Sequence, residues 1–218
     1  MKISCILFDL DGTLINTWDL YLEAFRLTVQ PYVRKTLTAE DIKNSKPTAE
    51  LHFIERTIPE KERDNAFRRF ITHYGNLYDT TAMGMYDGVD QMLDKLREAG
   101  YLLGIFTGKS KMAWEITSRK EKMGHFDVII TDNDVANHKP HPEGLRKATS
   151  MLNVETSSTL YVGDNLMDFH TASDAGSYYA AAIWSKSAEE KEAFRDLALK
   201  EGVRHFLEHP NDLLDLIK

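Results

Sequence analysis

The sequence contains one cysteine, few prolines and no long hydrophobic run. With Cys5 as the single cysteine among 218 residues, the chain cannot form an internal disulfide, and we expect Cys5 to be a small buried hydrophobe. No apolar stretch approaches the roughly 18 residues needed to span a bilayer. The first five residues also lack the pattern of a secretory signal. We therefore expect a cytoplasmic protein with no membrane partner.

Positive charge is in deficit as well. The 27 lysines and arginines are outnumbered by 34 aspartates and glutamates, for a formal net charge of −7. Such a chain repels the phosphate backbone of nucleic acids, so we exclude nucleic acid as its main partner. The length suits either one large domain or a domain with an insert.

The most informative segment is the motif Asp9-Leu10-Asp11-Gly12-Thr13. It follows the apolar run 3–8, which predicts a strand buried on both faces. Asp9 and Asp11 lie two residues apart in extended chain, so their side chains would point the same way. Because two clustered carboxylates repel each other, the pair predicts a divalent cation with hard oxygen ligands, namely Mg²⁺. An ordinary Asp-Gly turn or a helix cap is the alternative reading.

The rest of the chain falls into two kinds of pattern. Residues 16–82 have a broad amphipathic helical pattern without a convincing buried strand. From Gly84 onward, strands and helices alternate, which predicts a doubly wound parallel α/β sheet. The expected strands are 101–106, 126–130, 159–162 and 178–183, and the expected helices are 89–98, 111–122, 141–151, 168–175, 188–200 and 211–217. We predict a core domain formed by 1–15 and 83–218, with 16–82 inserted as a helical cap.

Polar residues follow three further predicted strands. Thr107 and Gly108 offer a hydroxyl and flexible backbone amides, which can hold phosphate oxygens. The neighbouring Gly108-Lys109-Ser110 resembles the end of a nucleotide-binding phosphate loop. That loop requires four residues between its glycines, whereas Gly104 and Gly108 have three between them, so we reject it.

The other two clusters contain Lys139, which stands before Pro140, and the pair Asp164 and Asp168. Asp164 is a candidate to complete a magnesium site with Asp9. Asp168 could orient Lys139 or bind water linked to the metal; alternatively, it compensates the dipole of the helix that begins there. His138 and His141 do not predict zinc, because no cysteine or third ligand lies near them in the sequence.

Together these four clusters resemble the haloacid dehalogenase superfamily, and specifically its helical-cap phosphatases. The matching motifs are Asp9 to Thr13, Thr107-Gly108, Lys139-Pro140, and Gly163-Asp164 with Asp168. The resemblance implies a Rossmann-like core, a mobile cap and Mg²⁺-dependent phosphoryl transfer through an aspartyl phosphate. Within that branch, phosphoglycolate phosphatases and a pyrophosphatase group are the nearest resemblances.

The resemblance also implies a role for each motif residue. Asp9 would be the nucleophile and Asp11 the general acid and base. Thr107, Lys139 and Mg²⁺ would stabilise the phosphoryl charge, while Gly108 would help to bind substrate. The implied metal ligands are Asp9, Asp164 and the backbone carbonyl of Asp11, supported by Asp168. Lys46, in the expected substrate-facing loop of the cap, is a candidate contact for an anionic leaving group.

Several alternatives remain at this stage. Asp11 argues against dehalogenases, which lack an acid there, and against phosphonate-cleaving enzymes, which have a small residue. A sugar phosphate mutase shares all four motifs and stays possible. A phosphorylatable receiver protein is disfavoured, because it would lack the helical insert and would carry its reactive aspartate on a later strand. We expect a small phosphorylated metabolite as substrate and either a monomer or a homodimer.

Overall fold

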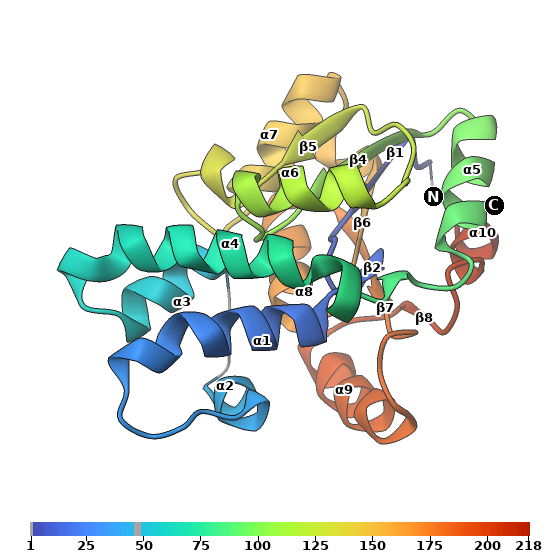
Figure 1. Cartoon of the computed structure of the whole chain (residues 1–218). Helices are drawn as coiled ribbons and strands as arrows, with labels where there is room; N and C mark the ends of the chain where they lie inside the picture. Colours follow the sequence, from blue (N-terminus) through green and yellow to red (C-terminus); the bar gives the residue numbers. More distant parts are fainter. Residues whose placement is uncertain (1, 46–48) are drawn as a thin grey trace. The chain divides into compact units, whose positions relative to one another are not determined.

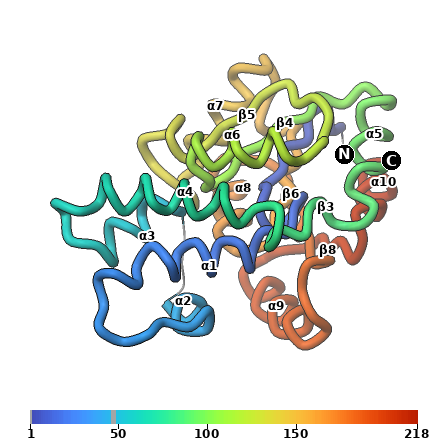
Figure 2. Tube along the Cα trace, in the orientation of Figure 1, coloured from blue at the N-terminus to red at the C-terminus, as the bar shows by residue number. Residues whose placement is uncertain are grey.

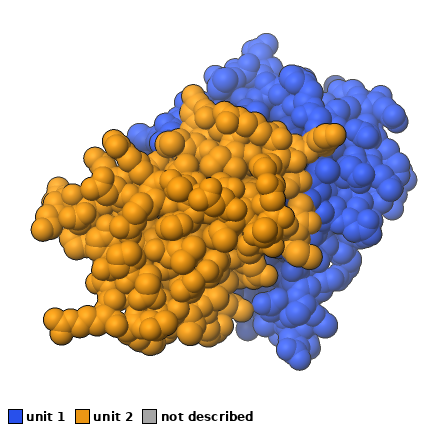
Figure 3. Space-filling view, in the orientation of Figure 1, with its two compact units in different colours: residues 1–16, 85–107, 123–218 blue, residues 17–84, 108–122 orange. Residues whose placement is uncertain are grey.

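The computed structural model describes residues 2–45 and 49–218, and these form two compact units (Figure 3). Unit 1 consists of Met1–Asn16, Met85–Thr107 and Met123–Lys218. Unit 2 consists of Thr17–Gly84 and Gly108–Lys122, so it includes a segment that lies beyond the predicted insert. The function of 16–82 as a substrate-covering cap stays a prediction.

Unit 1 contains a six-stranded sheet in the order β5-β4-β1-β6-β7-β8, with every paired neighbour parallel (Figure 1). The strands are β1 (Cys5–Phe8), β4 (Leu102–Phe106), β5 (Val128–Ile130), β6 (Thr159–Gly163), β7 (Tyr178–Ala182) and β8 (Phe206–Leu207). Phe8 at the end of β1 pairs with Ile105 on one side and Val162 on the other. The chain thus runs outward from β1 in both directions, which confirms the predicted α/β sheet. In such sheets the reversal point at the carboxyl edge is where ligands bind.

The strands form where short apolar runs are covered on both faces. Cys5 and Leu7 point into one apolar cluster together with residues of α7 (Glu143–Leu152), α8 (Leu166–Ala175) and α9 (Ala188–Glu201). The alternate positions Ile6 and Phe8, also fully buried, point to the opposite face. On unit 1, α5 (Val89–Glu98) contacts β4, and the C-terminal helix α10 (Asp212–Leu216) lies beside α5 (Figure 2).

A side-chain cap explains why one observed helix begins earlier than predicted. The predicted helix at 168 begins earlier, at Leu166, because the Asn165 side chain accepts a hydrogen bond from the Asp168 amide at 3.1 Å.

Short 3₁₀ helices occur at Gln30–Tyr32, Glu60–Glu62, Asp132–Asp134 and Thr156–Ser158. Strand β8 was not predicted, because two residues are too few for a recognisable alternating pattern.

Unit 2 is helical and has an aromatic core. Its helices are α1 (Trp18–Val29), α2 (Ala39–Asn44), α3 (Glu50–Thr57), α4 (Arg63–Thr81) and α6 (Lys111–Lys120). The ring of Phe25 lies 4.3 Å from that of Phe53 and 4.6 Å from that of Phe70, centroid to centroid. These contacts join α1, α3 and α4, and such pairs add to the free energy gained from burial alone.

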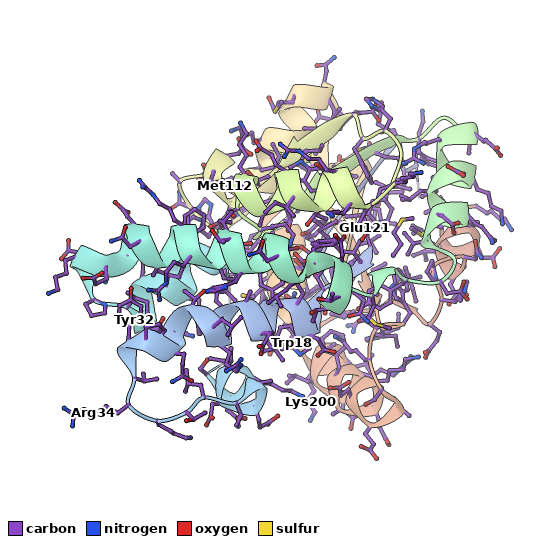
Figure 4. The ribbon with its side chains drawn as sticks, viewed as in Figure 1. Trp18, Tyr32, Arg34, Met112, Glu121 and Lys200 are labelled. Carbon is purple, nitrogen blue, oxygen red and sulfur yellow. The ribbon has the colours of Figure 1, made fainter. Side chains whose placement is uncertain are left out.

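Polar contacts attach α6 to α4 within unit 2. The hydroxyls of Tyr74 and Thr117 are 2.9 Å apart, and Tyr78 Oη donates to Glu121, labelled in Figure 4, at 2.9 Å. Where the chain passes between the units, β2 (Ile15–Asn16) and β3 (Gly84–Met85) pair in a two-stranded sheet. Among the residues described, none of the helices has the length and apolar character that a membrane span requires.

Candidate active site

Functional side chains from four parallel strands converge at the carboxyl edge of the unit 1 sheet. Asp9 follows β1, Thr107 follows β4, Lys139 lies in the segment after β5, and Asp164 follows β6. Because β4 and β6 flank β1, the strand order places Asp9 between Thr107 and Asp164. These residues are far apart in the sequence, and the parallel pairing of their strands brings them to the same edge of the sheet.

The centre of the site is a lysine held between two carboxylates. Lys139 Nζ lies 2.7 Å from Asp9 Oδ1 and 2.8 Å from Asp168 Oδ1. The exposed fractions of these side chains are 9% for Lys139, 9% for Asp9 and zero for Asp168. Tyr161 Oη also lies 3.1 Å from Asp168 Oδ1, so this carboxylate oxygen has two donors. Charge-assisted hydrogen bonds of this length, shielded from water, fix the position of the ammonium group.

Burial and charge act in opposite directions on these groups. Burial raises the pKa of Asp9 well above its usual value, Lys139 opposes the rise, and Asp168 and Asp164 add to it. Burial by itself would lower the pKa of Lys139, but the carboxylates of Asp168 and Asp9 outweigh it and raise that pKa. Lys139 therefore stays charged at neutral pH, and its positive charge favours the ionised form of Asp9.

Carboxylate oxygens of Asp9, Asp164 and Asp168 lie within 4.8 Å of one another. Burial raises the pKa of Asp164 also, although Lys186 opposes that rise. Asp168 Oδ2 is buried and has no hydrogen-bond partner among residues 2–45 and 49–218. A cluster of carboxylate oxygens with unsatisfied negative charge is the donor set that suits a hard divalent cation such as Mg²⁺. The residues present therefore fit the cofactor predicted from the sequence.

Two glycines lie so close to the carboxylates that a side chain at either position would collide with them. Gly12 has a φ of +84°, and a Cβ there would lie 2.8 Å from Asp164 Oδ2. A Cβ at Gly163 would lie 2.5 Å from Asp168 Cγ. Side chains at either position would displace an acidic group, so each glycine is required by close approach.

The segment that presents Lys139 is held by side-chain hydrogen bonds. Glu143 accepts from the backbone amides of Ala136 at 2.8 Å and Asn137 at 3.0 Å. His138 Nδ1 lies 2.6 Å from Asp132 Oδ1, whose side chain is 3% exposed. These contacts limit the freedom of the chain on the approach to Lys139 and help to place its side chain.

The remaining predicted residues have different surroundings. Asp11 is partly buried in the turn after β1. Burial, with smaller contributions from Asp164 and Asp11, raises the pKa of Tyr86 to about 12. Thr107 is buried, and its amide donates to the Ile130 carbonyl at 3.0 Å. Gly108 belongs to the unit 2 segment. Lys46 lies outside the described residues.

Sequence reasoning missed two residues of unit 1 that contact the motifs. Trp184 Nε1 donates to the Thr13 carbonyl at 2.9 Å, and Lys186 Nζ lies 3.2 Å from Asp164 Oδ2. Both come after β7, at the same sheet edge as the motifs. Polar residues that follow a buried strand are the pattern that identified the other site residues, and the same pattern could have identified these two.

A second missed group is a buried polar network in unit 2. Lys109, only 1% exposed, donates from Nζ to the hydroxyls of Tyr21 at 2.8 Å and Tyr74 at 2.7 Å. Tyr21 Oη in turn donates to Glu50 Oε1 at 2.5 Å. Glu50 Oε2 also accepts from the Ser110 amide at 3.2 Å. The chain directly after Gly108 is thereby bonded to α1, α3 and α4.

The four motif segments lie within the region matched by a known family. The model of the haloacid dehalogenase-like hydrolases matches residues 6–182. The chain belongs to this family. The match confirms that the chain is a hydrolase of the superfamily predicted from its motifs.

Relatives and solved structures of this family support the same assignment. Pyrophosphatase PpaX of Bacillus cereus (strain B4264) is 34% identical over 192 residues, which are 85% of each chain. A solved protein from Lactobacillus plantarum, assigned as a phosphoglycolate phosphatase, is 25% identical with a TM-score of 0.82, covering 99% of this chain and 100% of its own. CbbY from Rhodobacter sphaeroides, solved with phosphate, shares the fold at 24% identity and a TM-score of 0.80, over 97% and 96% of the chains.

Proposed function

We propose that the protein is a Mg²⁺-dependent phosphatase acting on a small phosphorylated metabolite, either a phosphoglycolate-like monoester or pyrophosphate. The reaction proceeds through an aspartyl phosphate on Asp9. The observation that carries this proposal is the buried contact of Lys139 with Asp9, at 2.7 Å, inside a cluster of three carboxylates. A lysine beside a carboxylate nucleophile is suited to receive a negatively charged phosphoryl group.

In the first step, an Asp9 carboxylate oxygen bonds to phosphorus and the bond to the leaving oxygen breaks. Asp11 donates a proton to that oxygen as it departs. In the second step, Asp11 takes a proton from water, which attacks phosphorus and releases Asp9 and inorganic phosphate. Dividing the displacement in this way replaces one difficult step by two easier ones.

Lys139 and Thr107 stabilise charge on the phosphoryl oxygens during both steps. Lys139 is held by Asp168, whose side chain is fully buried, so its ammonium group needs little reorganisation when charge develops. Asp168 acts on the reaction by holding Lys139 in position. Thr107 lies directly after β4 and offers its hydroxyl at the same sheet edge.

The Asp9 and Asp164 carboxylates, with the Asp11 backbone carbonyl, are the groups that would hold Mg²⁺. When bound, Mg²⁺ supplies positive charge that favours ionised Asp9 and offsets the charge of the phosphoryl group. Asp168 would support this site from its buried position beside Asp9. All these groups belong to unit 1.

The substrate class follows from the relatives' names and from the insert. The Bacillus cereus relative named above is a pyrophosphatase, and the Lactobacillus plantarum structure is assigned as a phosphoglycolate phosphatase. We assign selection of the leaving group to the helical insert, with Lys46 as its substrate-binding residue, and we assign substrate binding through the phosphoryl group to Thr107, Gly108 and Lys139. Small metabolites suit an enzyme whose inserted unit can close around the leaving group and exclude water.

The test is a phosphatase screen with phosphoglycolate, pyrophosphate and hexose phosphates, each with Mg²⁺ and with EDTA. We expect Mg²⁺-dependent release of inorganic phosphate from one of the first two substrates. Transfer of phosphate to a sugar would favour a mutase instead. An aspartyl phosphate that persists without turnover would favour a receiver protein. Phosphate release unaffected by EDTA would overturn the assignment of a magnesium enzyme.

A further inference from the structure

A second lysine, Lys186, also contacts the acidic cluster. It follows β7, whereas Lys139 follows β5, and these two strands lie on opposite sides of β1 in the sheet. Lys186 lies in the segment after β7, and its Nζ is 3.2 Å from Asp164 Oδ2. The exposed fractions are 17% for the Lys186 side chain and 19% for that of Asp164. An ion pair in this setting is screened less by water and salt than a fully exposed one.

The position of Lys186 is set by more than its ion pair. Its backbone amide donates to the Ile183 carbonyl at 3.2 Å, which closes a turn directly after β7. Its Nζ also lies 4.9 Å from the centre of the Phe194 ring, within reach of a cation–π interaction. Ser187, the next residue, caps α9 by accepting from the Glu190 amide. The turn, the aromatic ring and the helix start together hold the ammonium group beside Asp164.

The two lysines have different partners within the cluster. Lys139 bridges Asp9 and Asp168, both deeply buried, whereas Lys186 lies at the more accessible Asp164. Asp164 Oδ1 meanwhile accepts from Asn165 Nδ2 at 3.1 Å. Oδ2, the oxygen beside Lys186, is also the Asp164 atom nearest to the position that a Cβ at Gly12 would take. A cation that uses this oxygen must share it with an ammonium group or displace that group.

We propose that Lys186 is a positioning residue that sets the cation affinity of the cluster, weakening the binding of Mg²⁺ by holding a competing positive charge on Asp164. This inference rests on the proposed function, because it takes the cluster to be the magnesium site. Two like charges a few ångströms apart at a protein surface repel by kcal-scale energies. Removing the lysine charge should therefore tighten Mg²⁺ binding, a direction opposite to that expected from structural damage.

The experiment measures equilibrium binding of Mg²⁺ by calorimetry to the full chain, without substrate. Lys186→Met keeps an unbranched side chain at this position and removes the charge, and Lys186→Gln is a second neutral variant. We expect both to bind Mg²⁺ roughly tenfold more tightly than the wild type. Lys186→Arg should bind like the wild type, because it keeps the charge.

Lys191→Gln is the matched control, since Lys191 lies on neighbouring α9 but pairs with Glu208 at 2.8 Å. It should leave the affinity unchanged. Thermal unfolding in EDTA verifies that each variant is folded. If the folded neutral variants bind Mg²⁺ equally or more weakly, the role of Lys186 is overturned while the magnesium site stands. If neither they nor the wild type bind Mg²⁺, the magnesium site is overturned as well.

Discussion

Lys139 Nζ lies 2.7 Å from Asp9 Oδ1, a contact across 130 positions of the sequence. The same nitrogen is 2.8 Å from Asp168 Oδ1, so one ammonium group neutralises part of the charge on two buried carboxylates. This contact joins the segment after β5 to the end of β1 and the start of α8. The stability of this site and the proposed reaction therefore involve the same three side chains.

Asp9→Asn should abolish turnover while the protein still folds. The amide has nearly the shape of the carboxylate but cannot form an acyl phosphate, so we expect the rate to fall at least roughly 1000-fold. Rates of phosphate release and thermal unfolding would be measured together. The control is Asp90→Asn, an exposed change in the first turn of α5 that should leave the rate unaltered. A near-wild-type rate in Asp9→Asn would sink the proposed nucleophile.

Lys139→Met should destabilise the fold strongly, because it leaves Asp9 and Asp168 buried without their ammonium partner. Breaking a buried ion pair from one side costs about 3 to 5 kcal/mol. Adding Asp168→Asn should recover part of that loss, since it removes the charge of one of the two carboxylates that lack their ammonium partner. Urea unfolding of the two single variants and the double variant measures the coupling. Strictly additive losses would show that the two residues are not energetically linked.

Asp164 should make the protein less stable at neutral pH than at mildly acidic pH when Mg²⁺ is chelated. Burial, partly opposed by Lys186, raises the pKa of Asp164 in the folded state above its usual 3.8. The folded protein then holds this proton more tightly than the unfolded chain. The resulting stability is present below about pH 4 and is lost as the pH rises through the folded pKa.

Asp164→Asn should accordingly be more stable than the wild type in EDTA at pH 7, with the difference shrinking toward pH 4. Asp41→Asn provides a control for which the expected pH dependence of stability has the opposite sign. Lys35 and Thr38 lower the pKa of Asp41 to about 2, so its contribution is present at neutral pH and is lost on acidification. Unfolding curves measured across this pH range give the pH dependence of the free energy of unfolding for both variants. An Asp164→Asn variant that is less stable than the wild type at pH 7 would contradict the prediction.

Tyr21→Phe should destabilise unit 2. The change removes the hydroxyl that accepts from Lys109 and donates to Glu50, two residues that are each 1% exposed. Losing such a partner at a buried polar group costs about 1 to 3 kcal/mol. Chemical denaturation would be compared with that of Tyr178→Phe, a change at a tyrosine that is 41% exposed. Equal midpoints for the two variants would indicate that the network adds nothing to stability.

The alternating part of the fold was predictable because its periodic signals are local. The helix expected at 89–98 has those same bounds in α5, and each of the five expected strands overlaps an observed one. The start of α8 differed from the prediction because the Asn165 side chain caps it. The attachment of α6 to the helical insert was not predictable, because Tyr74 and Thr117 meet across 43 positions of the sequence.

The candidate site was predictable only in part for a related reason. Asp9, Thr107 and Asp164 each follow an apolar strand, which is a local pattern. Lys186 follows β7 in the same way but matches no motif, so its contact with Asp164 emerged only when the chain was folded. The burial of the Lys109 side chain among hydroxyls likewise has no local signal in the sequence.

The sequence alone determined the superfamily, because short motifs encode residue types and their spacing. Tertiary structure decided which charges meet. Parallel pairing of β1 with β4 and β6 sets the order of the strand ends, and packing excludes water from them. Once water is excluded, distances of about 3 Å between Lys139, Asp9 and Asp168 determine the pKa values and the stability of the site. No local pattern of residues contains those distances.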